Sequence, residues 1–276
     1  MASPAAVGGG LLGAGAIGVG SAYLAGAFEG ADSSKVEVEP ANVLLSHNGT
    51  PSTYTSDTVG KLYENYLVSP VDSKESGGTT INNQKWWEWS YKRWQADSGK
   101  ENNNLSVEFK NSQKINSPFS GITVTEDSPK ALNQVCEAVY KQNKSTIITL
   151  ESSPDNPTKL KRDLFKYCSI LGEVKTISEA GENYDNKKGG DSTNKKTFIS
   201  VTGNDKFWKI RNEEFYADGN GAKSKSKATG ESSKFKVKSA ETDKPEIRKI
   251  CEGAYESTKE EQTNYPIADV NIFCVL

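Results

Sequence analysis

Residues 83–88, Asn-Gln-Lys-Trp-Trp-Glu, recur as Asn-Asp-Lys-Phe-Trp-Lys at residues 204–209, without a gap and at an offset of 121 residues. Three further pairs of segments follow in the same order in both copies: 94–97 with 215–218, 129–140 with 245–255, and 163–168 with 269–274. Self-similarity of this kind is typical of a duplicated supersecondary unit. The sequence therefore predicts two related units in one chain.

Helical periodicity predicts that both units consist mainly of α-helices. Apolar residues from Leu132 to Tyr140 recur at i, i+3, i+4, i+7 and i+8, and the second copy repeats these steps from Ile247 to Tyr255. The predicted fold class is mainly α, with α+β containing a few short strands as the alternative. Other expectations are helices at 58–68 and 157–171, short strands at 105–109 and 197–201, and a solvated basic loop at 219–238.

The predicted divisions of the chain follow from the repeat and from shifts in composition. They are a transmembrane or signal-like segment at 1–28, a flexible linker at 29–57, helical module 1 at 58–168, and helical module 2, the internal repeat of module 1, at 169–276.

The charge balance and the residue inventory exclude several function classes. The chain has 276 residues, with 34 basic and 36 acidic side chains, so its net charge of -2 gives no basic footprint for nucleic acid. It contains one His, at position 47 in the expected linker, which removes most of the usual general-base and metal-ligand inventory. We therefore expect no metal, no catalytic residues, no cofactor and no enzymatic activity.

Residues 1–28 contain no charged side chain and are long enough to cross a bilayer as one helix. Small residues recur every four positions from Gly10 to Gly26, a ridge that suits close packing of helices in lipid and predicts homo-association there. The alternative is a cleaved signal peptide, because residues 25–27 have the small-x-small form of a cleavage site. The preferred interpretation is an uncleaved anchor at the cell membrane, with the body outside.

A competing interpretation is a dinucleotide-binding oxidoreductase that uses the glycines of this segment. Gly13, Gly15 and Gly18 fit the spacing G-x-G-x-x-G, and Glu39 follows at about the distance of an acid that would hold the ribose of NAD or FAD. The motif requires a strand immediately before it, but Gly-rich residues 8–12 stand there. The chain also lacks the alternation of strands and helices that a doubly wound sheet needs.

The aromatic residues of the first copy offer a second alternative, a glycan-binding surface. Positions that are aromatic in both copies are interpreted as core. Trp89 and Tyr91 have no aromatic counterpart in the second copy, so they are the candidates for surface contacts with sugars.

Each copy contains one early and one late cysteine. Four cysteines allow three pairings, and the duplication favours Cys136 with Cys168 and Cys251 with Cys274. Disulfides are expected if the body lies in an oxidising compartment. The alternative is that all four thiols are free and pack as small apolar side chains.

The plan of the chain resembles the paralogous membrane-anchored surface proteins of haemotropic mycoplasmas. The matching residues are the apolar segment 1–28, Trp208-Lys-Ile-Arg with Phe215, Cys136-Glu-Ala-Val-Tyr140, and Tyr167-Cys168-Ser-Ile. The resemblance implies a membrane-anchored protein of a wall-less blood parasite, displayed to the host and part of antigenic diversity. Its expected partners are the membrane, through residues 1–28, and a host-cell surface or host proteins.

Overall fold

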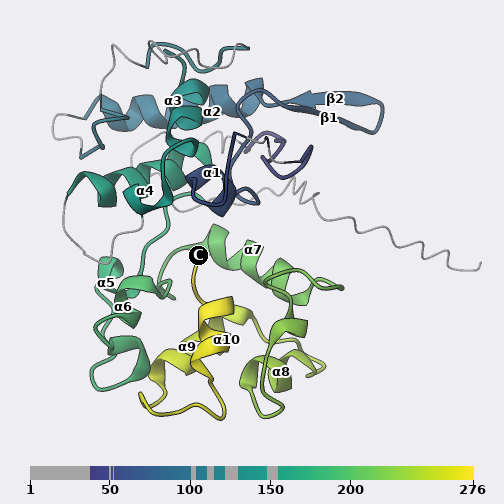
Figure 1. Ribbon diagram of the computed structural model, residues 1–276, viewed down its shortest axis with the longest axis vertical. Coiled ribbons are helices and arrows are strands. Elements are labelled where there is room, and N and C mark those ends of the chain that lie inside the picture. The colour runs from purple at the N-terminus through teal and green to yellow at the C-terminus, as the bar shows by residue number, and fades with distance from the viewer. Residues whose placement is uncertain are drawn as a thin grey trace, which may run out of the picture.

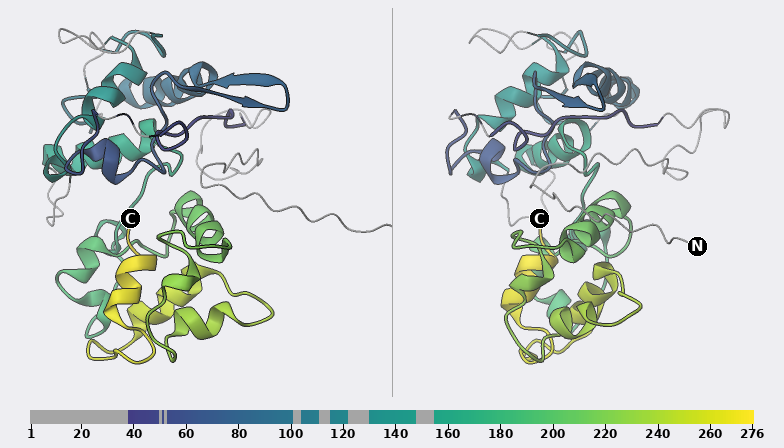
Figure 2. Two further views of the ribbon diagram at one scale, coloured as in Figure 1. Left: turned by 45° about the vertical axis from the view of Figure 1, so that its right-hand side comes forward. Right: turned by 90° about the vertical axis from the view of Figure 1, so that its right-hand side faces the viewer.

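The computed structural model describes residues 38–49, 51, 53–100, 104–110, 115–121, 130–147 and 155–276. The segment 1–28, and with it Gly13, Gly15 and Gly18, lies outside these residues. The described chain is mainly helical, as predicted, and forms two lobes that follow one another in the sequence (Figures 1 and 2). We call the lobe that ends at residue 168 unit 1 and the lobe that begins at residue 169 unit 2.

The elements of unit 1 are α1 (Val59–Leu62), β1 (Ser73–Ser76), β2 (Thr79–Asn82), α2 (Gln84–Ser98), α3 (Leu132–Tyr140), the 3-10 turn η1 (Lys144–Thr146) and α4 (Asn156–Cys168). Those of unit 2 are α5 (Ile177–Ala180), η2 (Lys188–Gly190), α6 (Asn194–Thr197), α7 (Asp205–Tyr216), η3 (Lys225–Lys227), α8 (Lys234–Ser239), α9 (Ile247–Glu256) and α10 (Ile267–Phe273). The C-terminus lies between the two lobes (Figure 1).

The strongest helical patterns in the sequence become the central helices α3 and α9. In α9 the buried residues are those at the predicted spacing: Ile247, Ile250, Cys251, Ala254 and Tyr255. The predicted helix at 157–171 is α4, which begins earlier because the Asp155 side chain accepts a hydrogen bond from the backbone N–H of Thr158 (3.1 Å). It ends at Cys168, after which the chain becomes extended.

One asparagine holds the same backbone turn in each unit. The Asn83 side chain accepts a hydrogen bond from the N–H of Val43 (2.7 Å) and donates to the carbonyl oxygens of Val43 (2.8 Å) and Ser69 (2.6 Å). Asn204 makes the same three contacts with the N–H and carbonyl of Lys175 (2.8 and 2.9 Å) and the carbonyl of Ser200 (3.0 Å). Both asparagines precede the long aromatic helix of their unit, α2 or α7.

The tryptophan that follows each asparagine completes this arrangement. The indole N–H of Trp87 donates to the carbonyl of Ser69 (3.2 Å), and that of Trp208 donates to the carbonyl of Ser200 (2.8 Å). A second aromatic ring packs edge-on against each of them, Trp86 in unit 1 and Phe207 in unit 2, with ring centroids 4.9 Å apart in both cases. The aromatic positions common to both copies are therefore buried at equivalent places.

The described part of the expected linker is packed against unit 1. Val43 and Leu45 are buried, and Leu44 forms an antiparallel bridge with Val68. Tyr54 is also buried and packs edge-on against Tyr140. The prediction of a flexible tether is wrong for these residues because the apolar side chains within the polar stretch enter the core.

Four local predictions are also wrong. Of the expected helix at 58–68 only α1 forms, because residues 63–66 form a turn and Leu67 then bridges Ser169. Residues 105–109 form a turn, not a strand, and the strand expected at 197–201 is a single bridge between Thr176 and Ile199. The basic stretch 219–238 contains η3 and α8, and Phe235 of α8 is fully buried.

Candidate functional site: the junction between the units

The junction is built around Trp89, one of the two aromatic residues predicted to be exposed. The residue is 7% exposed, and the Arg93 guanidinium carbon lies 4.4 Å and the Lys206 ammonium nitrogen 5.1 Å from its ring centroid. Arg93 comes from α2 itself, one helical turn on, whereas Lys206 comes from α7 of unit 2. Both contacts are cation–π interactions, and they bury the ring between the units.

Glu39 ties the start of the described chain to both units. Its carboxylate accepts a hydrogen bond from the indole N–H of Trp86 (2.9 Å) and forms an ion pair with Lys206. Burial lowers the pKa of Lys206, and the Glu39 carboxylate opposes that change. Glu39 is therefore the counter-charge of the partly buried Lys206 ammonium group, which leaves the predicted ribose contact without its free carboxylate.

A second polar contact joins the units at Tyr66. Its hydroxyl lies 2.9 Å from a carboxylate oxygen of Glu214 and 3.3 Å from the guanidinium of Arg211, both on α7. Burial raises the pKa of Tyr66, the Glu214 carboxylate adds to the increase, and Arg211 opposes it. The phenol therefore stays protonated at neutral pH and donates to Glu214.

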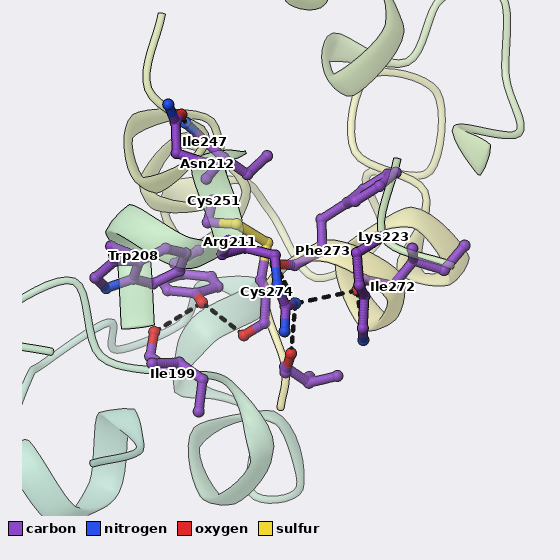
Figure 3. The surroundings of a disulfide bond; sticks show 12 residues. Ile199, Trp208, Arg211, Asn212, Lys223, Ile247, Cys251, Ile272, Phe273 and Cys274 are labelled. Atoms are coloured by element: carbon purple, nitrogen blue, oxygen red, sulfur yellow. Dashed lines mark hydrogen bonds between the residues drawn. A yellow bond between two sulfur atoms is a disulfide. The ribbon is translucent and has the colours of Figure 1, made fainter. Parts of the chain in front are cut away.

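Arg211 also holds the end of the chain. Its guanidinium is buried and donates to the carbonyl oxygens of Phe273 (3.0 Å) and Val275 (2.7 Å), at the C-terminal end of α10. Figure 3 shows this side chain pointing toward Phe273 beside the Cys251–Cys274 disulfide. Lys223 donates to the carbonyl of Ile272 (2.8 Å) from the other side, and burial lowers its pKa to about 8. A cation at the carbonyl end of a helix complements the helix dipole.

Each unit contains one disulfide that joins its next-to-last α-helix to the end of its last α-helix. Cys136 on α3 is bonded to Cys168 at the end of α4, and Cys251 on α9 is bonded to Cys274 after α10. All four cysteines are fully buried. These are the two within-unit pairs that the duplication favours.

The remaining predicted contact residue, Tyr91, is half-buried and stacks on Trp94 with ring centroids 5.4 Å apart. The structure therefore does not bring Trp89 and Tyr91 together as an exposed platform. The prediction for Trp89 is wrong because a position that differs between the copies can be buried where one copy packs against the other. The residues missed by the sequence are Lys206, Arg211 and Glu214, and the only signal was the charge of Arg211 within an otherwise aromatic face.

The junction pairs Glu39 with Lys206 and Arg211 with Glu214, whereas Nη1 of Arg93 is buried with no hydrogen-bond partner among the described residues. Away from the junction, Tyr184 lies in a shallow hollow of about 470 Å³, which is also lined by Asn183, Asp185, Lys187 and Glu256. Burial and the nearby carboxylates of Glu182, Glu252 and Glu256 raise the pKa of Tyr184, so its phenol is not a base at neutral pH. Within the described ranges, no group of His, Cys, Asp or Glu side chains could hold a metal ion.

Comparison with protein-family models, with curated proteins and with solved structures finds no match. In the part of the chain that the structure describes, no helix is both long and apolar enough to span a membrane. The candidate anchor at 1–28 lies outside that part.

Proposed function

We propose that the protein is held in the cell membrane by residues 1–28 and displays its two units outside the cell, where they act by non-covalent contact with host molecules and not by catalysis. The observation on which this proposal rests is the presence of one fully buried disulfide in each unit. Disulfides form and persist in oxidising compartments and are rare in the reducing cytosol.

The absence of charge from residues 1–28 supports the membrane part of the proposal. A run of this length is sufficient for one transmembrane helix, and nine residues separate it from Val38, where the described structure begins. The inter-unit contacts support the non-catalytic part. Glu39 is paired with Lys206, and Arg211 is engaged with Glu214 and with backbone carbonyls, in contacts that hold the units together.

The test is protease treatment of intact cells that carry the full-length protein with a tag at its C-terminus. We expect the tag and the body to be digested from outside, while a short N-terminal fragment stays in the detergent-soluble membrane fraction. A cytosolic marker protein in the same cells controls for lysis. If the body survives protease in intact cells but is digested after lysis, the display proposal fails.

The cysteines provide a second, independent readout in the same cells. Lysates denatured in the presence of a maleimide-linked polymer report the number of free thiols as a shift in gel mobility. We expect no shift without reductant and a shift of four additions after reduction. Four additions without reductant would show that the protein resides in a reducing compartment and would remove the principal support for display.

A further inference from the structure

The β1–β2 hairpin is an insertion that only unit 1 contains. Thirteen residues separate Ser69 from Asn83, whereas three separate their structural equivalents Ser200 and Asn204. No residue from 73 to 82 is buried, so the hairpin adds nothing to the core of unit 1. It extends away from the body beyond the N-terminal end of α2 (Figures 1 and 2). A two-stranded hairpin of this kind is marginally stable alone, which suggests a role in contact, not in folding.

The register of the hairpin shows which backbone groups face outward. The turn is formed by Gly77 (φ 57°) and Gly78 (φ 77°), and both positive φ angles fit a two-residue type I′ turn. Ser76 pairs with Thr79 next to this turn, and Glu75 then pairs with Thr80. Hydrogen-bonded and non-hydrogen-bonded pairs alternate along an antiparallel ladder. The backbone N–H and C=O groups of Thr80 therefore point away from β1, as do those of Asn82.

The two outer edges of the hairpin differ. On the β1 edge, the carbonyl of Ser73 already accepts a hydrogen bond from the Asn48 side chain (3.1 Å). On the β2 edge, the outward backbone groups of Thr80 and Asn82 have no partner among the described residues. The strand β2, Thr-Thr-Ile-Asn, contains no charge and no proline. Charged residues and proline are the features with which natural proteins usually protect a strand edge from pairing with another chain.

We propose that the β2 edge pairs antiparallel with the β2 edge of a second copy of this chain, about a twofold axis at Ile81. In an antiparallel pair, directly opposite side chains point to the same face of the sheet. Two identical strands related by a twofold axis can therefore pair a residue with the same residue of the other copy, or with the residue two positions along the strand. Pairing of Thr80 with Asn82 of the second copy meets this requirement, and it aligns the outward backbone groups of both strands in two hydrogen-bonded pairs.

The side chains also suit this register. Ile81 lies opposite Ile81 of the second copy in the closer, non-hydrogen-bonded type of pair. Lys74, which is the partner of Ile81 within the hairpin, flanks this contact on each outer strand, where its aliphatic stem can cover the isoleucines. The same self-pairing through β1 would place Lys74 opposite Lys74 or Glu75 opposite Glu75. Charge therefore favours β2 as the edge that pairs.

Four residues on each side bury far less surface than the roughly 1,200 Å² of a stable complex. The association is therefore weak and depends on local concentration, and in this respect it rests on the proposed display of the protein in a membrane. The geometry of the edge does not depend on that proposal.

The test is disulfide trapping of the full-length protein with Ile81→Cys, and the matched control is Lys74→Cys. The two positions share a face and similar partial exposure, but in the proposed dimer Lys74 is three strand spacings, roughly 14 Å, from its copy. That separation exceeds the roughly 7 Å limit between the Cα atoms of a disulfide. We expect Ile81→Cys to form covalent dimers at least tenfold faster than Lys74→Cys, both in membranes and in concentrated detergent solution.

A third variant checks the register. Addition of Thr80→Lys to Ile81→Cys places cations beside the axis and should reduce the trapping rate to that of Lys74→Cys. Equal trapping rates for Ile81→Cys and Lys74→Cys would overturn the proposal, as would crosslinking of Ile81→Cys to a different protein in place of its own copy. Trapping in detergent combined with failure of the protease test would reject surface display while retaining the dimer.

Discussion

Tyr140 and Tyr255 occupy equivalent places in the two units. The hydroxyl of Tyr140 donates to the carbonyl oxygens of Val68 and Cys168, each at 2.9 Å. That of Tyr255 lies 2.8 Å from the carbonyl of Ile199 and 3.3 Å from that of Cys274. In both units the same hydroxyl thus joins an extended segment to the second cysteine of the disulfide, so the disulfide and the tyrosine fix one corner of the core together.

Replacement of either tyrosine by phenylalanine should destabilise the protein without changing its fold. The ring still fills the core, but two buried carbonyl oxygens lose a hydrogen bond, which costs about 1–3 kcal/mol. Urea unfolding followed by tryptophan fluorescence measures this cost. Because the two sites lie in different units, Tyr140→Phe and Tyr255→Phe should have additive effects in the double variant. A cost below 0.5 kcal/mol for both would contradict the role of the hydroxyl.

The asparagine pair allows a sharper comparison, because Asn204 has a positive φ of 55° whereas Asn83 has a φ of -83°. Either Asn→Ala variant loses three hydrogen bonds to backbone groups, and we expect a cost of about 2–4 kcal/mol. At position 204 alanine also suffers left-handed strain of about 1–2 kcal/mol, which glycine avoids. Asn204→Gly should therefore be more stable than Asn204→Ala, whereas Asn83→Gly should be no better than Asn83→Ala. The denaturant midpoints of the four variants measure this difference between positions 83 and 204.

Patterns that recur in both copies could be read from the sequence. The spacing of apolar residues in 132–140 and 247–255 predicted α3 and α9, and the positions of the four cysteines favoured the two pairs that are bonded. These signals are local or are repeated, so one sequence contains enough information to detect them.

Features that depend on packing between distant segments could not be predicted in this way. Trp89 is buried because Lys206 and Glu39 come from elsewhere in the chain to the same place. Val43 lies in a polar stretch that resembles a linker, and its burial and its contacts with Asn83 and Ser69 show that it belongs to unit 1. Tertiary contacts of this kind override local composition.

Removal of one disulfide should destabilise the protein by increasing the entropy of the unfolded chain. The bonds close loops with sequence separations of 32 and 23 residues, for which the chain-entropy relation gives about 3–4 kcal/mol each. We expect the paired Ser variants, C136S with C168S and C251S with C274S, to lose similar amounts of stability in urea. A loss confined to one pair would indicate that the units do not depend on their disulfides in the same way.

The stability of the protein should fall in acid through Asp97. Although burial opposes it, hydrogen bonds from Lys100, Lys166 and Tyr167 lower the pKa of Asp97 to about 2. The carboxyl group is thus more acidic in the folded than in the unfolded state. Its contribution, about 2 kcal/mol, is present above pH 5 and is lost as the pH falls toward 2.

The variant Asp97→Asn isolates this contribution, because the amide oxygen can still accept the hydrogen bond from Tyr167 (2.7 Å from the Asp97 carboxylate). Burial raises the pKa of Asp163, so its effect on stability changes with pH in the opposite direction to that of Asp97. Because Asp163 is present in both proteins, its effect cancels when their unfolding free energies are compared. Unfolding free energies of the two proteins should differ by about 2 kcal/mol at pH 6 and converge near pH 2. A constant difference across this range would exclude Asp97 as the source.

The burial of Trp89 changes what its mutation is expected to do. If this ring were a glycan platform, Trp89→Ala would abolish binding and leave stability unchanged. Since it packs at the junction, we expect a loss of about 3–5 kcal/mol in urea unfolding, the usual cost of removing a buried tryptophan. Tyr91→Ala, at a half-buried site on the same helix, should cost less than 2 kcal/mol. Lys206→Met, which keeps the aliphatic stem but removes the charge over the ring, should fall between the two. A stable Trp89→Ala variant that loses binding on a glycan array would contradict this assignment and restore the sugar-binding interpretation.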